Sequence, residues 1–169
     1  ALELTPNYGN ARHWYANLLC FQGRGEESIE QMQAAMQVDP LSAQIANSMG
    51  WTYYVLRRYG ESIRQLEQVL ELDPSFANAH LLLSLNYLER GDRKLADHHV
   101  RRAIELDPGH PEYELFKAYV EARLGRSERA RESLRHAQAD VDIIARSAIV
   151  HVALGEYELA LDDLERALD

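Results

Sequence analysis

Residues 71–108 read ELDPSFANAHLLLSLNYLERGDRKLADHHVRRAIELDP, a segment that begins and ends on the same four letters. Its two prolines, Pro74 and Pro108, are 34 residues apart, and Pro40 and Pro6 continue that spacing toward the N-terminus. A fixed period of about 20 to 50 residues is the sequence signature of a stacked repeat architecture. The proline spacing therefore predicts an internal repeat.

Two further positions recur with the same 34-residue period. One slot holds Gly23, Gly91 and Gly125, with Arg57 in its place in the second unit. The other always holds a side chain of small or medium size, namely Ala35, Val69, Ala103 and Ala137. A length of 169 residues is close to five such units, so the chain is better interpreted as an open stack than as one globular domain with a central core.

Each unit has the pattern of a helical hairpin. Apolar residues recur three and four positions apart over Ser75–Glu89 and again from Asp92 to Glu105, as amphipathic helices require. Asp92 can cap the second helix by accepting backbone N–H bonds, and Gly91 can take the left-handed conformation that ends the first. Pro108 then breaks the chain, because it lacks an N–H and clashes with a preceding turn.

We therefore expect an all-α fold, a right-handed superhelical solenoid of helix-turn-helix hairpins with about ten helices. The whole chain, 1–169, is interpreted as a single array. The expected units are 9–42, 43–76, 77–110, 111–140 and 141–169, preceded by 1–8 as the tail of another repeat.

The last unit and the first residues depart from the regular spacing. Gly155 follows Gly125 by 30 residues instead of 34, and Asp142 occupies the proline slot. We expect a shorter connection there, with Asp142 as the N-cap of a helix that starts at Ile143. Residues 1–4, ALEL, match the end of a second helix, and no polar cap is visible at either end, so we expect an excerpt of a longer protein.

The 34-residue unit resembles the tetratricopeptide repeat (TPR), in which the first helix carries a large residue, Leu-Gly and Tyr, and the second carries Ala, a bulky residue and Ala before Pro. The unit 77–110 supplies Leu83-Ser84, Tyr87, Ala96, Val100, Ala103 and Pro108. The unit 111–144 departs most, because Lys117 and Glu121 occupy expected core slots. The resemblance implies a protein–protein interaction module, a role that the TPR scaffold serves in unrelated proteins.

Two short segments resemble the C-terminal TPR arrays of bacterial regulators, among them winged-helix activators, adenylate cyclases and kinases. They are His13-Trp14-Tyr15-Ala16 and Gly50-Trp51-Thr52-Tyr53. This resemblance implies that the chain is the scaffolding or sensory part of a larger bacterial regulator.

In TPR arrays the first helix of each unit lines the concave face, which implies a partner-binding groove here. Its candidate residues are Asn10, His13, Asn17, Gln44, Asn47, Trp51, Tyr54, Asn78, Leu81, Leu85 and Tyr119. Asn17, Asn47, Trp51 and Tyr54 form the expected centre, because amides can bond an extended peptide backbone while Trp and Tyr anchor binding. Alternatively, Trp51 and Tyr54 pack between neighbouring helices. No Lys or Arg stands where a carboxylate clamp would need one.

Composition and motifs argue against other functions. A formal net charge of -9 argues against nucleic-acid binding, and no apolar run approaches the length that crosses a bilayer. No catalytic motif is present, so we expect no enzyme activity and no cofactor. His98 and His99 point about 100° apart on a helix and cannot easily share a metal ion. Cys20 is expected to be an apolar filler, and Asp162-Asp163 with Glu156–Glu158 an exposed charged face.

Two alternatives to partner binding remain at this stage. The array can self-associate through its uncapped repeat ends, which would make it a structural homo-oligomer. A metal-dependent activity of the histidines is the other. We expect a cytoplasmic location, although the lone thiol is also compatible with the periplasm.

Overall fold

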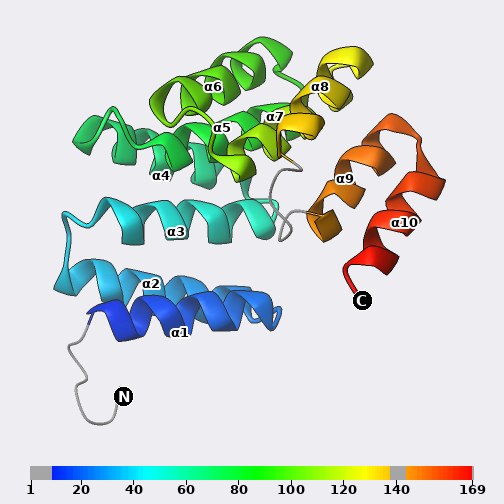
Figure 1. Cartoon of the computed structure of the whole chain (residues 1–169). Helices are drawn as coiled ribbons and strands as arrows, with labels where there is room; N and C mark the ends of the chain where they lie inside the picture. The colour runs from blue at the N-terminus through cyan, green and yellow to red at the C-terminus, as the bar shows by residue number, and fades with distance from the viewer. Residues whose placement is uncertain (1–8, 138–143, 169) are drawn as a thin grey trace. The chain divides into compact units, whose positions relative to one another are not determined.

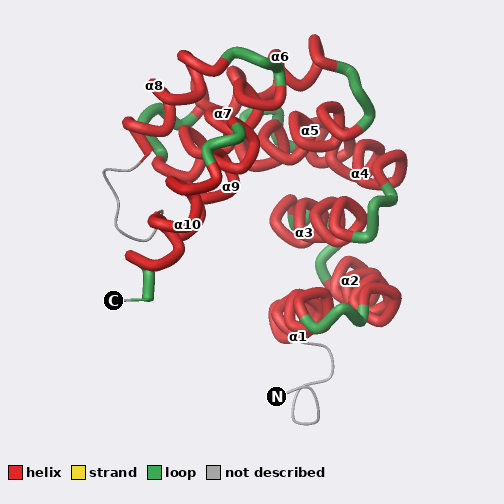
Figure 2. The backbone as a smooth tube through the Cα atoms, turned by 90° about the vertical axis from the view of Figure 1, so that its right-hand side faces the viewer, coloured by secondary structure: helices red, strands yellow, loops and turns green. Residues whose placement is uncertain are grey.

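The computed structural model describes residues 9–137 and 144–168, and every regular element in these ranges is an α-helix (Figure 2). The ten helices are α1 (Gly9–Phe21), α2 (Gly25–Val38), α3 (Ala43–Val55), α4 (Tyr59–Leu72), α5 (Ala77–Glu89), α6 (Arg93–Leu106), α7 (Pro111–Arg123), α8 (Ser127–Ala137), α9 (Ile144–Leu154) and α10 (Tyr157–Arg166). The all-α prediction and the expected number of helices are confirmed. None of these helices is both long and apolar enough to span a bilayer.

The turns between helices form for the local reasons that the sequence indicated. Gly91 has a φ of 80°, in the left-handed region that glycine adopts without strain. The carboxylate of Asp92 accepts a hydrogen bond of 3.0 Å from the backbone N–H of Leu95 and so caps α6. The expectations for residues 1–8 and for Asp142 concern positions outside the described ranges.

The described chain divides into two compact units, 1–86 and 87–169, and the division falls inside α5. In the first unit α1 and α2 form a hairpin, α3 contacts both of them, and α4 pairs with α3 (Figure 1). The buried core of this unit consists of Ala16, Ile29, Met32, Ala35, Ile45 and Met49. Each hairpin thus buries its apolar stripe against the next one.

In the second unit α7 pairs with α8 and α9 with α10, while α7 also contacts α6 and α9. The core of this unit is formed by Leu115, Ala118, Leu134, Ala137 and Val150. Glu121 is buried in a slot expected to be apolar, and its carboxylate accepts a hydrogen bond of 3.1 Å from Arg126. Lys117 donates to Glu114 at 3.3 Å. Ion pairing therefore accommodates the two departures from the repeat pattern.

One sequence-based interpretation is wrong. Asp162 is exposed as expected, but Asp163 is buried, so this pair does not form a uniform charged face. The two side chains point to different sides of α10, because adjacent residues on a helix are rotated by about 100°. Asp163 faces α9, where it accepts a hydrogen bond from Ser147.

Candidate partner-binding surface

The polar centre of the first unit is a contact between α1 and α3. His13 is buried, and its Nε2 lies 2.7 Å from Ser48 Oγ and 3.2 Å from Asn17 Nδ2. Because the Asn17 amide nitrogen can only donate, the contact requires Nε2 to accept, as in a neutral imidazole. Burial lowers the pKa of His13 and favours the same neutral form. His13 therefore orients Asn17 at the surface and does not itself face a partner.

Asn47, next to Ser48 on α3, is buried with its Oδ1 lacking a hydrogen-bond partner. A buried carbonyl oxygen without a donor raises the free energy of the folded state by about 1–3 kcal/mol. Native proteins leave few such groups unpaired unless a water, an ion or a ligand completes them. Asn47 thus marks a place on α3 where an additional donor would be stabilising.

The aromatic side chains at the centre of the surface stack on one another. The rings of Trp51 and Tyr54 have centroids 5.6 Å apart and planes inclined by 28°, and the Tyr54 ring also lies 5.9 Å from that of Tyr59 on α4. Trp51 and Tyr54 are both half-buried. Each ring therefore packs against the fold with part of its surface and presents the rest to solvent.

The candidate residues divide by exposure. The exposed ones are Asn10 and Gln44; the half-buried ones are Asn17, Trp51, Tyr54, Asn78 and Tyr119; the buried ones are His13, Asn47, Leu81 and Leu85. Buried side chains cannot contact a partner without rearrangement. The accessible candidates in the first unit are thus Asn10, Asn17, Gln44, Trp51, Tyr54 and Asn78, and we call this set the amide–aromatic face.

Tyr119 belongs to the second unit and has its own local partner. Its hydroxyl accepts a hydrogen bond of 2.5 Å from Arg123 Nη1, and the guanidinium of Arg123 lies 5.5 Å from the centroid of the Tyr119 ring. The amide–aromatic face, by contrast, contains no charged side chain.

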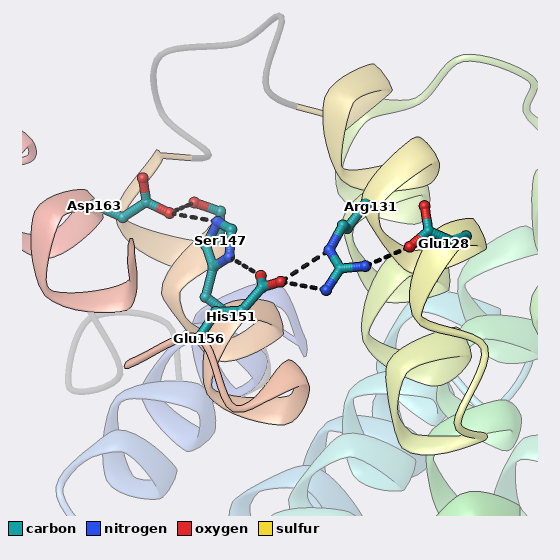
Figure 3. A network of polar contacts seen from close by, with 6 residues as sticks. All are labelled: Glu128, Arg131, Ser147, His151, Glu156 and Asp163. Carbon is teal, nitrogen blue, oxygen red and sulfur yellow. Dashed lines mark hydrogen bonds and ion pairs between the residues drawn. The ribbon is translucent and has the colours of Figure 1, made fainter. Parts of the chain in front are cut away.

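Sequence reasoning missed a polar network that joins α8, α9 and α10 (Figure 3). Asp163 accepts from Ser147 and lies 3.5 Å from His151 Nε2, while His151 Nδ1 lies 2.8 Å from Glu156. Two nitrogens of Arg131 donate to the same oxygen of Glu156, at 2.8 and 2.6 Å.

The electrostatics of Glu156 show the strength of this network. Burial raises its pKa, but the hydrogen bonds from His151 and Arg131 outweigh burial and hold the pKa below its usual range.

The sequence did carry a signal for the position of Asp163 in this network. Asp163 lies eight residues after the glycine of its hairpin, at a position that is polar in every unit. The equivalent residues are Gln31, Gln65, His99 and Ser133.

A family model described as "Tetratricopeptide repeat" matches the chain at residues 15–74, 47–96 and 81–142. The chain belongs to the tetratricopeptide repeat family. TPR repeats generally mediate protein–protein interaction and generally serve as non-catalytic scaffolds. No curated protein matches the chain by sequence.

Solved TPR structures share the fold at low sequence identity. TTC0263, a thermophilic TPR protein of Thermus thermophilus, has a TM-score of 0.81 at 20% identity over 95% of this chain and 90% of that one. PilW, a widely conserved type IV pilus biogenesis factor, has a TM-score of 0.73 at 20% identity, covering 99% and 86%. YrrB, described as a TPR protein with an unusual peptide-binding site, has a TM-score of 0.60 at 21% identity, covering 100% and 89%.

The cysteine thiol and two of the histidine rings of this TPR chain are packed within the fold. Cys20 is buried, and burial raises the pKa of its thiol, which disfavours the nucleophilic thiolate. The His99 ring stacks on Tyr87, with centroids 5.5 Å apart, and His80 is buried. Within residues 9–137 and 144–168, no cluster of three or more His, Cys, Asp or Glu is arranged to hold a metal ion.

Proposed function

We propose that this TPR chain is a protein–protein interaction module that binds an extended, uncharged peptide segment on the amide–aromatic face. The observation that carries the proposal is the Trp51–Tyr54 stack, which is fixed against the fold and still half-exposed. Rigid aromatic rings bury a large contact area at low entropic cost and are typical anchors of binding energy.

The polar groups around the stack favour recognition of the peptide backbone. Asn17 is held by His13, so its remaining hydrogen-bonding groups are oriented before a partner arrives. The unpartnered Oδ1 of Asn47 accepts a donor once local rearrangement opens the site. An amide has both a donor and an acceptor, as does each peptide unit, and this match supports an extended partner.

The absence of charge on this face distinguishes the proposed partner from a charged tail. None of Asn10, Asn17, Gln44, Trp51, Tyr54 and Asn78 is ionisable in the neutral range. A terminal carboxylate would find no Lys or Arg among them, and charge-assisted hydrogen bonds are the stronger ones. We therefore expect internal peptide segments to bind as well as free C-termini do.

Among the structural neighbours, YrrB is described as having a peptide-binding site and PilW as a pilus biogenesis factor. Their use of a similar fold supports an interaction role for this chain. We further propose a scaffolding, non-catalytic and cytoplasmic part of a larger bacterial regulator. That proposal rests on the resemblance of residues 13–16 and 50–53, and the full-length sequence around the chain tests it.

The test is selection of linear peptides from a displayed random library, with affinities then measured by calorimetry. We expect Trp51→Ala to weaken binding about 30-fold, equivalent to loss of a hot spot of about 2 kcal/mol. Asn17→Ala should weaken it less. Because no charge is involved, affinity should change little with salt concentration.

Two matched controls accompany these variants. Phe21→Ala removes an exposed aromatic ring, and Gln22→Ala removes an exposed amide; both lie outside the proposed face. Binding should survive both substitutions. If no peptide is enriched, or if Trp51→Ala and Phe21→Ala have equal effects, the proposed site is wrong.

A further inference from the structure

The hairpin of α7 and α8 lacks a side-chain contact that the hairpins before and after it contain. In the preceding hairpin Tyr87 stacks on His99, with ring centroids 5.5 Å apart and planes inclined by 11°. In the last hairpin the equivalent residues are His151 and Asp163, and His151 Nε2 lies 3.5 Å from the Asp163 carboxylate. In the α7–α8 hairpin these two repeat positions hold a glutamate and a serine, at 121 and 133.

Glu121 and Ser133 are both buried but do not fill this place. Each is 3% exposed, and the Glu121 carboxylate accepts a hydrogen bond of 3.1 Å from Arg126. Together with Lys117 they line a cavity of about 360 Å³, whose other walls come from α6 and α8 (Figure 1). Sites for small molecules have volumes of about 300–1,000 Å³. The cavity therefore has the size of a ligand site, at a repeat position where the preceding hairpin contains two rings.

The cavity wall carries free charges of both signs. Lys117 Nζ lies 3.3 Å from Glu114, which uses only one of the three donors of an ammonium group. Arg129 and Glu132 on α8 also line the cavity; both are exposed, and neither forms an ion pair within the described part of the chain. A ligand that carries both a carboxylate and an ammonium group would meet a partner for each of them.

The rest of the wall suits an aromatic ring. Ile104 of α6 is half-buried and contributes an apolar side chain to the cavity. The methylene stem of Lys117 adds apolar surface below its charged end. The guanidinium groups of Arg101 and Arg129 line the cavity as well, and such groups stack favourably on the faces of aromatic rings. A planar ring is therefore the body that this space and its cations accommodate best.

We propose that the cavity between α6, α7 and α8 binds a small zwitterion with an aromatic ring, of the class of the aromatic α-amino acids. The ligand's carboxylate pairs with Lys117 and Arg129, and its ammonium group pairs with Glu132. Its ring enters the space beside Ser133. The site belongs to the second unit and uses no residue of the amide–aromatic face, so it is independent of the peptide-binding proposal.

Calorimetric titration of the whole chain with L-phenylalanine tests the chemical class of the ligand. We expect saturable binding of one molecule per chain. Phenylacetate lacks the ammonium group, phenethylamine lacks the carboxylate and L-alanine lacks the ring, so each should bind at least about tenfold more weakly. If L-phenylalanine does not bind, or if phenylacetate binds equally well, the proposal is wrong.

Two arginines of α8 form a matched pair of variants that locate the site. Arg129→Ala removes a cation of the cavity wall and should weaken L-phenylalanine binding about tenfold. Arg135→Ala removes an exposed arginine from the same helix, outside the cavity, and should leave the affinity unchanged. Glu132→Gln should act like Arg129→Ala, because it removes the partner of the ammonium group. Equal affinities of the two arginine variants would overturn the assignment.

A substitution that fills the cavity gives an independent check. Ser133→His introduces the residue that the preceding hairpin has at this position, and its ring should occupy the space of the ligand and abolish binding. Circular dichroism shows whether the variant is folded; if it is not, the exposed Arg129 and Glu132 variants decide. A folded Ser133→His chain that still binds L-phenylalanine would contradict the proposed site. Binding should also weaken with added salt, unlike peptide binding to the amide–aromatic face.

Discussion

Arg57 has a left-handed backbone conformation at the end of α3, with a φ of 58°. The equivalent turn residues are glycines, namely Gly23, Gly91, Gly125 and Gly155, with φ values from 77° to 80°. An L side chain in this region brings its Cβ close to the following carbonyl oxygen, at a cost of about 1–2 kcal/mol. The hairpin of α3 and α4 therefore forms against a local strain that the other described hairpins lack.

We expect Arg57→Gly to raise the free energy of unfolding by about 0.5–1 kcal/mol, because the strain relieved exceeds the added entropy of the unfolded chain. Urea denaturation of the two proteins measures the change. The reverse exchange, Gly91→Arg, should lower stability, by about 1 kcal/mol. A loss of stability in Arg57→Gly would show that the Arg57 side chain contributes more than its backbone costs.

At the scale of single elements, α10 is held to α9 partly by the buried carboxylate of Asp163. This carboxylate accepts from Ser147 and faces His151 Nε2, and His151 in turn contacts Glu156, which pairs with Arg131 on α8 (Figure 3). Loss of one buried acceptor leaves the facing donors without partners. The last hairpin thus depends on a polar network as well as on its apolar contacts.

We expect Asp163→Ala to lower the free energy of unfolding of the α9–α10 hairpin by about 1–3 kcal/mol. The neighbouring substitution Asp162→Ala removes an exposed carboxylate from the same helix and should change stability by less than about 0.5 kcal/mol. Thermal unfolding followed by far-ultraviolet circular dichroism compares the two. If Asp163→Ala and Asp162→Ala change the stability by the same small amount, the network contributes nothing to the hairpin.

At the scale of the whole molecule, the chain consists of two compact units in which helices contact mainly their sequence neighbours. The stability of such a fold is approximately a sum of local hairpin and interface contributions. Both tryptophans, Trp14 and Trp51, lie in the first unit. Tryptophan fluorescence therefore reports the first unit alone, while circular dichroism reports all helices.

We expect Asp163→Ala to shift part of the circular dichroism transition to lower urea and to leave the tryptophan fluorescence transition in place. Its effect should be confined because the stack transmits stability only between neighbouring hairpins. Equilibrium unfolding of wild type and variant by both probes is the measurement. A parallel shift of both probes would show instead that the two units unfold as one cooperative body.

The fold could be predicted to a large extent because its signals are local. Pro108 restricts its own backbone, Gly91 permits the left-handed turn without strain, and an apolar period of three to four residues specifies a helix wherever its neighbours lie. The candidate surface could be predicted only in part. The burial of His13 depends on Ser48, 35 residues away, and the burial of Asp163 on which side of α10 meets α9. Such pairings follow from the packing of elements, not from the repeat.

The contacts by which α3 packs on α1 and α2 have a consequence for the evolution of such chains. Because a hairpin meets its neighbours through residues that recur every 34 positions, a copied hairpin brings matching surfaces at both of its ends. In-frame duplication can therefore lengthen the array without a new core, and loss of a whole hairpin can shorten it. Arg57, in a slot that holds glycine in the other described hairpins, shows that the units of this chain are no longer identical.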